Sequence, residues 1–421
     1  MPVTERQPLR GYLPHGVQDL FQGEAARRRQ AEATLRGLFS RWAYSELIPP
    51  TFEYDETLAV GAGADLRRAM YRFFDREGHT LALRADFTTQ VARMAATKLF
   101  NQPLPLRCFY IGSVFRYEEP QVGRQREFTQ AGVELIGANT PAADAEVVAL
   151  AVAALEALEV RDFQINLGQM ALFRALTADL PPDKIECIRE ATDQRNPARL
   201  RQALDAAGVA GPRRALLASL PDLIGGPEVL QEALAFGGAV REAAERLAQV
   251  YRLLEACGVA ERIILDLGEV RGMDYYTGIT FRGVAPGLGW PILSGGRYDD
   301  LIGQFGRPLA AVGFGLGIER ALLVQTPQAQ PLSLSPHLVV QGCDHPACLS
   351  LVRRLRQAGH RIEVDVLGRQ GEALLAHARR QGCRRVLRCR DDGHCWLLGD
   401  EKGERAVTAD RLLEEMKTWN D

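Results

Sequence analysis

Strand-like runs lie on both sides of a long helical block in this 421-residue chain, and this arrangement limits the possible folds more than any other feature. Between roughly 168 and 262, Ala, Leu, Arg and Glu dominate, and proline and glycine breakers divide the block into short helices. The strand-like runs outside the block are 106–118, 127–137, 262–267, 277–284 and 311–316. We therefore predict an α+β domain over residues 1–325, in which a helical insertion interrupts an antiparallel sheet.

Helices are expected on the flanks of this sheet. Apolar residues recur at helical spacing over 24–43, and the segments 88–99 and 141–158 are also rich in helix formers. Asp86 or Thr88 could cap the second of these helices. A further helix is expected to begin at 318, directly after the last strand.

A second, smaller domain is expected at the carboxyl end. Residues 326–336 contain three prolines and no charged residue, which is typical of a linker. The pattern from 337 to 421 begins as strand, helix, strand, helix, strand. This pattern predicts a compact α/β domain after the linker.

Charge and hydropathy exclude some functions. The 51 basic and 53 acidic residues give a formal charge of -2, which argues against a dedicated nucleic-acid-binding protein but permits a local basic patch. No run of about 18 apolar residues is present, and residues 1–16 lack the apolar core of a secretory signal. We therefore expect a cytoplasmic protein that does not bind membranes.

The eight cysteines are spread along the chain without a tight CxxC pair, as is typical of reduced thiols. Cys383, Cys389 and Cys395, with His394 beside the last, could suggest a zinc site. Their six-residue step matches no common zinc spacing, so we expect no metal.

Two further segments have side chains suited to anionic or planar ligands. Arg116 and Arg126 flank a polar loop near Phe128, and a guanidinium can bind a carboxylate or phosphate while a phenyl ring can stack on a purine. A solvated charged hairpin is the simpler alternative. In residues 313–320 (GFGLGIER), the glycines could let a planar ligand approach the backbone, with Arg320 covering it.

Taken in order, these segments resemble a known family. Pro50 after a long helix, the segment 115–128 and the segment 313–320 are similar to motifs 1, 2 and 3 of class II aminoacyl-tRNA synthetases. Residues 271–278 (RGMDYYTG) and 294–299 (SGGRYD) resemble signatures of the histidyl branch. The resemblance covers about residues 8–325 and implies a class II synthetase-like antiparallel sheet flanked by helices.

This branch has two kinds of member, histidyl-tRNA synthetase and its paralogue, the regulatory subunit of ATP phosphoribosyltransferase. Residues 83–93 resemble the paralogue, because Asp86 and Phe87 stand where synthetases have Glu and Gly. The segments 13–20, 42–57 and 220–230 are also more similar to the paralogue.

The paralogue implies a noncatalytic subunit that binds histidine and is required for the first step of L-histidine biosynthesis and for its allosteric feedback control. The implied partner is the short catalytic ATP phosphoribosyltransferase, in a hetero-octamer built around a homodimer of this chain. The resemblance implies no cofactor and no catalytic residue.

Other features favour a histidine-tRNA ligase, which would use ATP, magnesium and tRNA. Arg116, Arg126, Arg271 and Arg320 are all present, although the paralogue often lacks such groups. The C-terminal domain, with six arginines between 379 and 390, resembles an anticodon-binding domain, although those arginines could equally form a solvated surface. A histidine-sensing adaptor for another partner is a third hypothesis.

The resemblance also assigns roles to individual residues. Asp86 and Thr88 would face the amino group of histidine, and Gln130 would join them while also reaching the carboxylate. Arg271 would pair with the carboxylate or a phosphate, and Glu134 and Tyr276 would hold the imidazole nitrogens. Arg116 and Tyr275 would also belong to the histidine site. An ATP or phosphate site would use Arg116, Arg126, Phe128 and Arg320. Each has a simpler alternative: the tyrosines could be core residues, Glu134 could pair with an arginine, and Asp86 could be only a helix cap. Only His15 and His79 precede residue 337, which disfavours a hydrolase.

Overall fold

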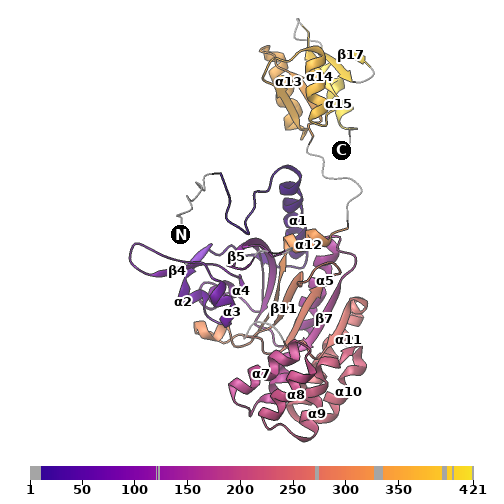
Figure 1. Ribbon diagram of the computed structural model, residues 1–421. Helices are drawn as coiled ribbons and strands as arrows, with labels where there is room; N and C mark the ends of the chain where they lie inside the picture. The colour runs from indigo at the N-terminus through magenta and orange to yellow at the C-terminus, as the bar shows by residue number, and fades with distance from the viewer. Residues whose placement is uncertain are drawn as a thin grey trace, which may run out of the picture. The chain divides into compact units, whose positions relative to one another are not determined.

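The computed structural model describes residues 11–119, 121, 124–270, 275–326, 335–390, 396–400 and 403–419. The chain divides into two compact units (Figure 1). The first comprises Met1–Leu20 and Arg27–Pro327, and the second comprises Gln328–Asp421 with Phe21–Ala26. Each unit has its own sheet and its own buried core.

A nine-stranded sheet with the order β1-β5-β6-β12-β11-β10-β7-β9-β8 forms the centre of the first unit. The sheet is antiparallel except where β1 pairs with β5 and β7 pairs with β9, so it is mixed at its margins. The strands are β1 (Ser45–Glu46), β5 (Leu106–Phe115), β6 (Glu127–Ile136), β7 (Gln164–Gln169), β8 (Ile224–Gly225), β9 (Ile263–Asp266), β10 (Ile279–Val284), β11 (Leu293–Arg297) and β12 (Ala311–Gly317). The predicted sheet of mainly antiparallel strands is therefore confirmed, with parallel pairs only at its margins.

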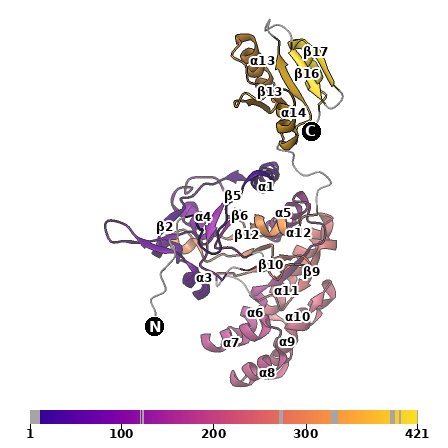
Figure 2. The same ribbon diagram turned by 45° about the horizontal axis from the view of Figure 1, so that its top comes forward.

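Helices cover one face of this sheet (Figure 2). They include α1 (Gln22–Arg41), α5 (Pro141–Ala157), α11 (Gly238–Ala256) and α12 (Ile318–Val324). Phe39 of α1 shows how they pack: its ring centre lies 5.5 Å from that of Phe109 in β5 and 6.3 Å from that of Phe314 in β12. The large core cluster fills this face and leaves the opposite face available for a site.

The opposite face is bordered by α4 (Thr88–Thr97), whose residues pack with Tyr110 of β5 in a second core cluster. Phe87 occupies the cap position and makes no side-chain capping hydrogen bond, whereas the expected cap Asp86 hydrogen-bonds the backbone N–H of Thr89 in the first turn. A small sheet with the order β2-β4-β3 lies in the same part of the chain. Its strands are β2 (Phe52–Tyr54), β3 (Arg72–Phe74) and β4 (Thr80–Leu83), and the short helices α2 (Asp55–Leu58) and α3 (Ala64–Ala69) lie between β2 and β3 in the sequence.

The helical block extends from Met170 to Ala256, and α7 to α10 gather in one lobe (Figure 1). Prolines lie in the first turns of α7, α8 and α9, where a missing N–H costs nothing. The block contains α6 (Met170–Thr177), α7 (Pro182–Asp193), α8 (Pro197–Ala206), α9 (Gly211–Ser219), α10 (Gln231–Phe236) and the 3-10 turns η1 (Leu220–Asp222) and η2 (Pro227–Leu230). The remaining 3-10 turns are η3 (Ala260–Arg262) and η4 (Ile302–Phe305).

The second unit has a five-stranded sheet with the order β14-β13-β15-β16-β17. The first three strands are mutually parallel, and the last two are antiparallel additions. Its elements are β13 (Leu338–Gln341), α13 (Pro346–Gln357), β14 (Ile362–Asp365), α14 (Gly371–Arg380), β15 (Val386–Cys389), β16 (Trp396–Asp400), β17 (Gly403–Val407) and α15 (Ala409–Met416). Most of the expected linker, residues 327–334, lies outside the described residues.

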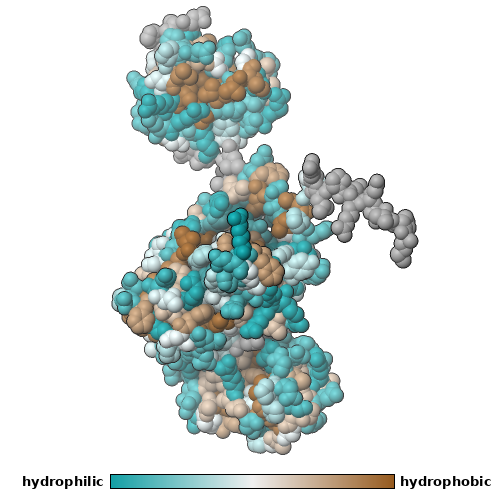
Figure 3. Space-filling view, turned by 90° about the vertical axis from the view of Figure 1, so that its left-hand side faces the viewer, coloured by the Kyte–Doolittle hydropathy of each residue, from teal (hydrophilic) through white to brown (hydrophobic). Residues whose placement is uncertain are grey.

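The surface of the second unit carries a hydrophobic patch in the view of Figure 3. Large apolar side chains exposed in this unit include Leu349, Val366 and Leu367. In the part of the chain that the structure describes, no helix has both the length and the apolar character needed to cross a membrane.

Candidate functional site

A cavity of about 320 Å³ lies in the first unit, on the sheet face opposite the large helical core. This volume is at the lower end of the range of small-molecule sites, roughly 300–1,000 Å³. Strands β6, β10, β11 and β12 supply most of its wall, and Asp86 and Thr88 close it at the start of α4. The cavity is therefore built largely on rigid strands.

Strand alternation decides which side chains enter the cavity. Phe128, Gln130 and Glu134 are separated by even numbers of residues on β6, so all three point to the same face. On neighbouring β12, a Cβ at Gly313 would lie 1.8 Å from Glu134 Oε2, and one at Gly315 would lie 2.4 Å from Gln130 Nε2. The close approach predicted for these glycines is real, but the protein's own side chains fill the space that the prediction gave to a ligand.

Glu134 is buried and accepts hydrogen bonds from three hydroxyl groups. Thr88 Oγ1 donates at 2.9 Å and Tyr110 Oη at 3.3 Å to Oε1, while Tyr298 Oη donates to Oε2. Burial raises the pKa of Glu134 to about 8, although the hydroxyls act in the opposite direction. The sequence offered the alternative that Glu134 pairs with an arginine, but these three hydrogen bonds come from hydroxyl groups instead. A carboxyl poised near neutral pH can hold either form of an imidazole nitrogen.

Three buried acceptor atoms around the cavity have no hydrogen-bond donor among the described residues. They are Asp86 Oδ2, Gln130 Oε1 and Glu269 Oε1. Leaving one such atom unpaired costs about 1–3 kcal/mol. The arrangement is therefore suited to a ligand that brings several N–H donors.

Burial has the largest effect on the pKa values of Asp86 and Glu269, the two acidic residues of this set. Burial raises the pKa of Asp86, and the charge of Arg116 and the amide of Thr89 only partly oppose it. Burial also raises the pKa of Glu269 to about 7, despite the ion pair between Glu269 and Arg282. A cationic or N–H-rich ligand would stabilise the charged form of both carboxyls.

Tyr275 and Tyr276 line the cavity beside Tyr298. The ring centre of Tyr275 lies 5.1 Å from that of Tyr276 and 5.5 Å from that of Tyr298. Both belong to the second core cluster, so they are core aromatics that also form the wall of the cavity. The two interpretations offered by the sequence are therefore compatible.

Arginines occupy another part of the cavity wall. The guanidinium carbons of Arg116 and Arg320 lie 5.3 Å and 5.8 Å from the centre of the Phe128 ring. Arg116 Nε donates to Ala85 O at 2.9 Å, and Arg320 Nη1 donates to Pro291 O at 2.9 Å. Burial, followed by the charge of Arg116, lowers the pKa of Arg320 to about 10. These groups are suited to an anion beside a planar ring.

Two expected site residues are not placed in the cavity. Arg126 does not line it: its guanidinium lies 4.2 Å from the centre of the Tyr117 ring, and its Nε donates to Glu118 O at 3.1 Å. Arg271 lies outside the described residues. Of the two arginines expected in the histidine site, Arg116 is therefore the one that the structure places at the cavity.

Several cavity residues were not predicted as site residues. Tyr298 lay within the histidyl-like segment 294–299. Tyr110 does not line the cavity but donates to Glu134, and it was not predicted either. Other lining residues that were not predicted include Arg124, Glu269, Arg282 and Trp290.

Phe87 directly follows Asp86 in the sequence, and its side chain packs in the second core cluster. Its ring is stacked on Tyr110, with centres 4.4 Å apart and planes inclined by 10°, and the guanidinium of Arg84 lies 4.3 Å from its centre. Tyr110 in turn donates to Glu134. The phenylalanine that distinguishes this sequence from the synthetase pattern therefore supports a residue that holds Glu134.

Residues 16–321 match the family described as histidyl-tRNA synthetase. Curated relatives named ATP phosphoribosyltransferase regulatory subunit include one from Moorella thermoacetica, which is 44% identical over 374 residues, 88% of this chain and 96% of the relative. A Geobacter metallireducens relative of the same name is 36% identical, with 98% of each chain covered.

Two solved structures share the fold. A structure from Bacillus halodurans, titled as an ATP phosphoribosyltransferase regulatory subunit/histidyl-tRNA synthetase, has a TM-score of 0.80 and 29% identity, covering 91% of this chain and 99% of the other. Histidyl-tRNA synthetase from Nostoc sp. PCC 7120 has a TM-score of 0.78 over 97% and 99% of the two chains. At 21% identity, the Nostoc structure supports the fold alone.

Proposed function

Because this chain belongs to the family of ATP phosphoribosyltransferase regulatory subunits and has a histidyl-tRNA synthetase-like domain, we propose that its cavity binds free histidine and thereby controls a separate catalytic chain. The family name gives the chain a regulatory role in histidine biosynthesis. Histidine binding and feedback control are the finer parts of the proposal, and they rest on the cavity.

Two of the three unpaired acceptors, Asp86 Oδ2 and Gln130 Oε1, carry this proposal together with Glu134. Histidine has an ammonium group with three N–H donors and an imidazole ring with one or two. Asp86 and Gln130 would receive the ammonium group, and Glu134 would receive the ring between the hydroxyls that already surround it. A ligand that lacks these donors would leave buried acceptors unpaired, which accounts for selectivity.

The carboxylate of histidine would lie toward Arg116. Arg116 lines the same cavity as Asp86, and its charge partly opposes the rise in the pKa of Asp86 that burial causes. An amino acid has opposite charges on one carbon atom, so it requires an acidic group and a basic group close together. Asp86 and Arg116 provide this pair.

Regulation requires histidine to bind one assembly state more tightly than another. We propose that this chain assembles with the short catalytic ATP phosphoribosyltransferase, as a homodimer within a hetero-octamer, and performs no catalysis itself. No cofactor is needed for this role. The phenylalanine at 87 is compatible with it, because that residue stabilises the pocket without adding a reactive group.

Co-expression with the short catalytic subunit tests the assembly. We expect the two chains to copurify, with a mass by light scattering that matches a hetero-octamer, and L-histidine to inhibit phosphoribosyl transfer by the complex. The Asp86→Asn complex should form normally but need more histidine for the same inhibition. Failure of the chains to associate, together with no effect of this chain on the catalytic subunit, would refute the proposal.

A second candidate is histidine-tRNA ligase, which the arrangement of Arg116 and Arg320 around Phe128 favours because it is suited to a nucleotide. The test is histidine-dependent exchange between ATP and pyrophosphate in the presence of magnesium. We expect no exchange from a regulatory subunit. Exchange followed by charging of tRNA would establish the ligase instead.

A further inference from the structure

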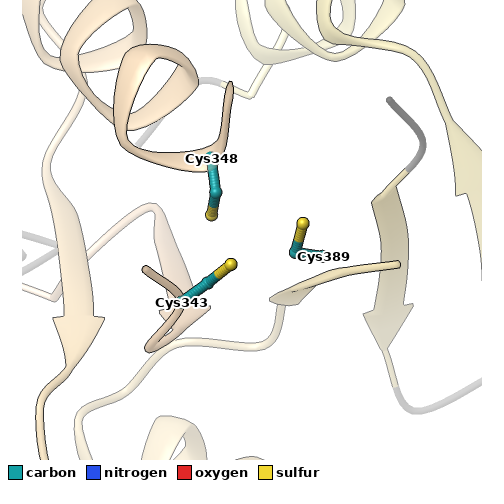
Figure 4. Close-up of side chains that lie close together, drawn as sticks. All are labelled: Cys343, Cys348 and Cys389. Carbon is teal, nitrogen blue, oxygen red and sulfur yellow. The ribbon is translucent and has the colours of Figure 1, made fainter. Parts of the chain in front are cut away.

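Three cysteine thiols converge in the second unit (Figure 4). The Sγ atoms of Cys343, Cys348 and Cys389 all lie within 4.8 Å of one another. Cys348 is buried, and the other two are partly buried. No part of the cavity in the first unit is involved, so this cluster is a separate feature.

The topology of the sheet explains why distant cysteines meet. Strands β13 and β15 are adjacent and parallel, so their carboxyl ends lie at the same edge of the sheet. Cys389 is the last residue of β15, and Cys343 follows the end of β13 by two residues. Cys348 lies in the first turn of α13, which begins directly after that loop. Ligands commonly bind at this edge of an open α/β sheet.

We propose that these three cysteines bind a thiophilic metal ion, with zinc as the expected ion. Zinc bonds to thiolate sulfur at about 2.3 Å, which places the sulfurs of a tetrahedral site roughly 3.8 Å apart. The observed grouping within 4.8 Å requires only small side-chain rotations to reach that geometry. Three convergent thiols are also better explained by a metal than by a disulfide, which would use two and leave one.

Two features around the cluster would stabilise a metal-bound thiolate, although burial raises the pKa of the Cys348 thiol to about 12 in the metal-free chain. The backbone N–H of His345 donates to Cys343 Sγ at 3.4 Å, an interaction of the kind that orients and stabilises a metal-bound sulfur. The thiol of Cys348 lies at the amino end of the 12-residue helix α13, where the helix dipole favours negative charge. A metal here would join α13 to β15 and stabilise the core between them.

The sequence prediction of no metal rested on a different set of cysteines. Cys383 lies in a separate buried cluster with Val339 and Leu374, and its Sγ donates to Arg385 O at 3.2 Å. Cys395 and His394 lie outside the described residues. The spacing argument therefore missed Cys343 and Cys348, which only the parallel pairing of β13 and β15 brings to Cys389.

Metal analysis of the full-length chain, purified under reducing conditions, tests the proposal directly. We expect about one zinc ion per chain. We expect zinc to fall to background in Cys343→Ser and Cys389→Ser, while Cys383→Ser, a control from the same domain, retains it. Replacement of zinc by cobalt(II) should produce thiolate-to-cobalt charge-transfer absorption, and this absorption should weaken in each cluster variant. A chelator should lower the thermal midpoint of the wild-type chain and leave that of Cys389→Ser unchanged.

Circular dichroism of each variant distinguishes loss of a ligand from loss of the fold, and cobalt titration of the folded Cys348→Ser variant gives an independent test. A reduced wild-type chain that neither contains zinc nor takes up added zinc or cobalt(II) would overturn the proposal. Unchanged metal content in all three cluster variants would overturn it as well. So would a disulfide within the trio in a metal-free chain that retains its full stability.

Discussion

The cavity has an acceptor side, formed by Asp86, Gln130 and Glu269, and an arginine side, formed by Arg116 and Arg320. The two sides differ in how many of their buried polar atoms already have hydrogen-bond partners within the chain. At the acceptor side, Asp86, Gln130 and Glu269 each have a buried oxygen without a donor among the described residues. At the arginine side, Arg116 and Arg320 donate to backbone carbonyls. The acceptor side therefore depends on a ligand more strongly than the arginine side does.

This difference bears on sensing and catalysis. A histidine sensor needs the acceptor side to recognise the ammonium and imidazole groups, whereas a ligase also needs the arginine side to position ATP. Because buried acceptor atoms without donors among the described residues lie on the acceptor side, the comparison favours a histidine sensor over a ligase. Mutations on the two sides should separate the two functions.

The largest effect is expected from Gly313→Ala. Its Cβ would lie 1.8 Å from Glu134 Oε2 and 2.4 Å from Val133 O, so Glu134 must move out of position. We expect histidine affinity to fall roughly 100-fold or more. Isothermal titration calorimetry measures the loss. The matched control is Gly317→Ala on the same strand, where the new Cβ meets Arg320 at an ordinary 3.5 Å. Equal losses of histidine affinity in the two variants would show that the two sides of the cavity do not differ in their importance for histidine binding.

The next effect is expected from Asp86→Asn, which keeps the shape of the side chain but removes its charge. A hydrogen bond to a charged group contributes about 1.5–3 kcal/mol, so histidine affinity should fall roughly 10- to 100-fold. Arg320→Gln, on the arginine side, should change histidine affinity far less. A larger loss in Arg320→Gln than in Asp86→Asn would reverse the comparison.

A smaller effect is expected in the pH dependence of stability. The pKa of Glu134 is raised from 4.5 to about 8 in the folded chain, so the folded chain holds this proton more tightly than the unfolded chain. The ligand-free chain should therefore lose stability as pH rises through that interval, by on the order of a few kcal/mol. Thermal midpoints measured between pH 5 and about pH 8.5 give the slope, and the part due to Glu134 should be absent in Glu134→Gln. An identical slope in the two chains would show that Glu134 does not titrate in this range.

The smallest effect is expected from Arg124→Gln. Arg124 pairs with Glu118 and lies 4.3 Å from the centre of the Trp290 ring, so it is already engaged within the chain. We expect histidine affinity to stay within about twofold of the wild type, because a partly exposed ion pair contributes little. A tenfold loss by calorimetry would show that Arg124 itself takes part in histidine binding.

Much of the fold could be predicted from the sequence. The strands at 106–118 and 127–137 and the helix at 141–158 have strong periodicity or composition, and the structure has β5, β6 and α5 there. Strand β11 was missed because Gly295 and Gly296 lower its strand propensity, although their small size is required where the ring of Phe281 or Tyr276 packs against them. Strand β7 (Gln164–Gln169) was also missed, and only its last two residues fall in the expected helical insertion, which begins at about 168.

The cavity could be predicted only in part. The family resemblance named Glu134 and Tyr276, but it did not name Tyr110 and Tyr298, whose hydroxyls hold Glu134 from other strands and loops. Contacts of this kind depend on strand pairing rather than on local pattern. The same reason explains the cysteine cluster, whose members are brought together by β13 and β15.

The most direct test compares three ligands by calorimetry: L-histidine, L-histidinol, which lacks the carboxylate, and imidazolepropionate, which lacks the ammonium group. If the acceptor side dominates recognition, histidine binds and imidazolepropionate binds at least roughly 10-fold more weakly, whereas histidinol loses less. No binding of histidine at millimolar concentration would contradict the account, and so would imidazolepropionate binding as tightly as histidine.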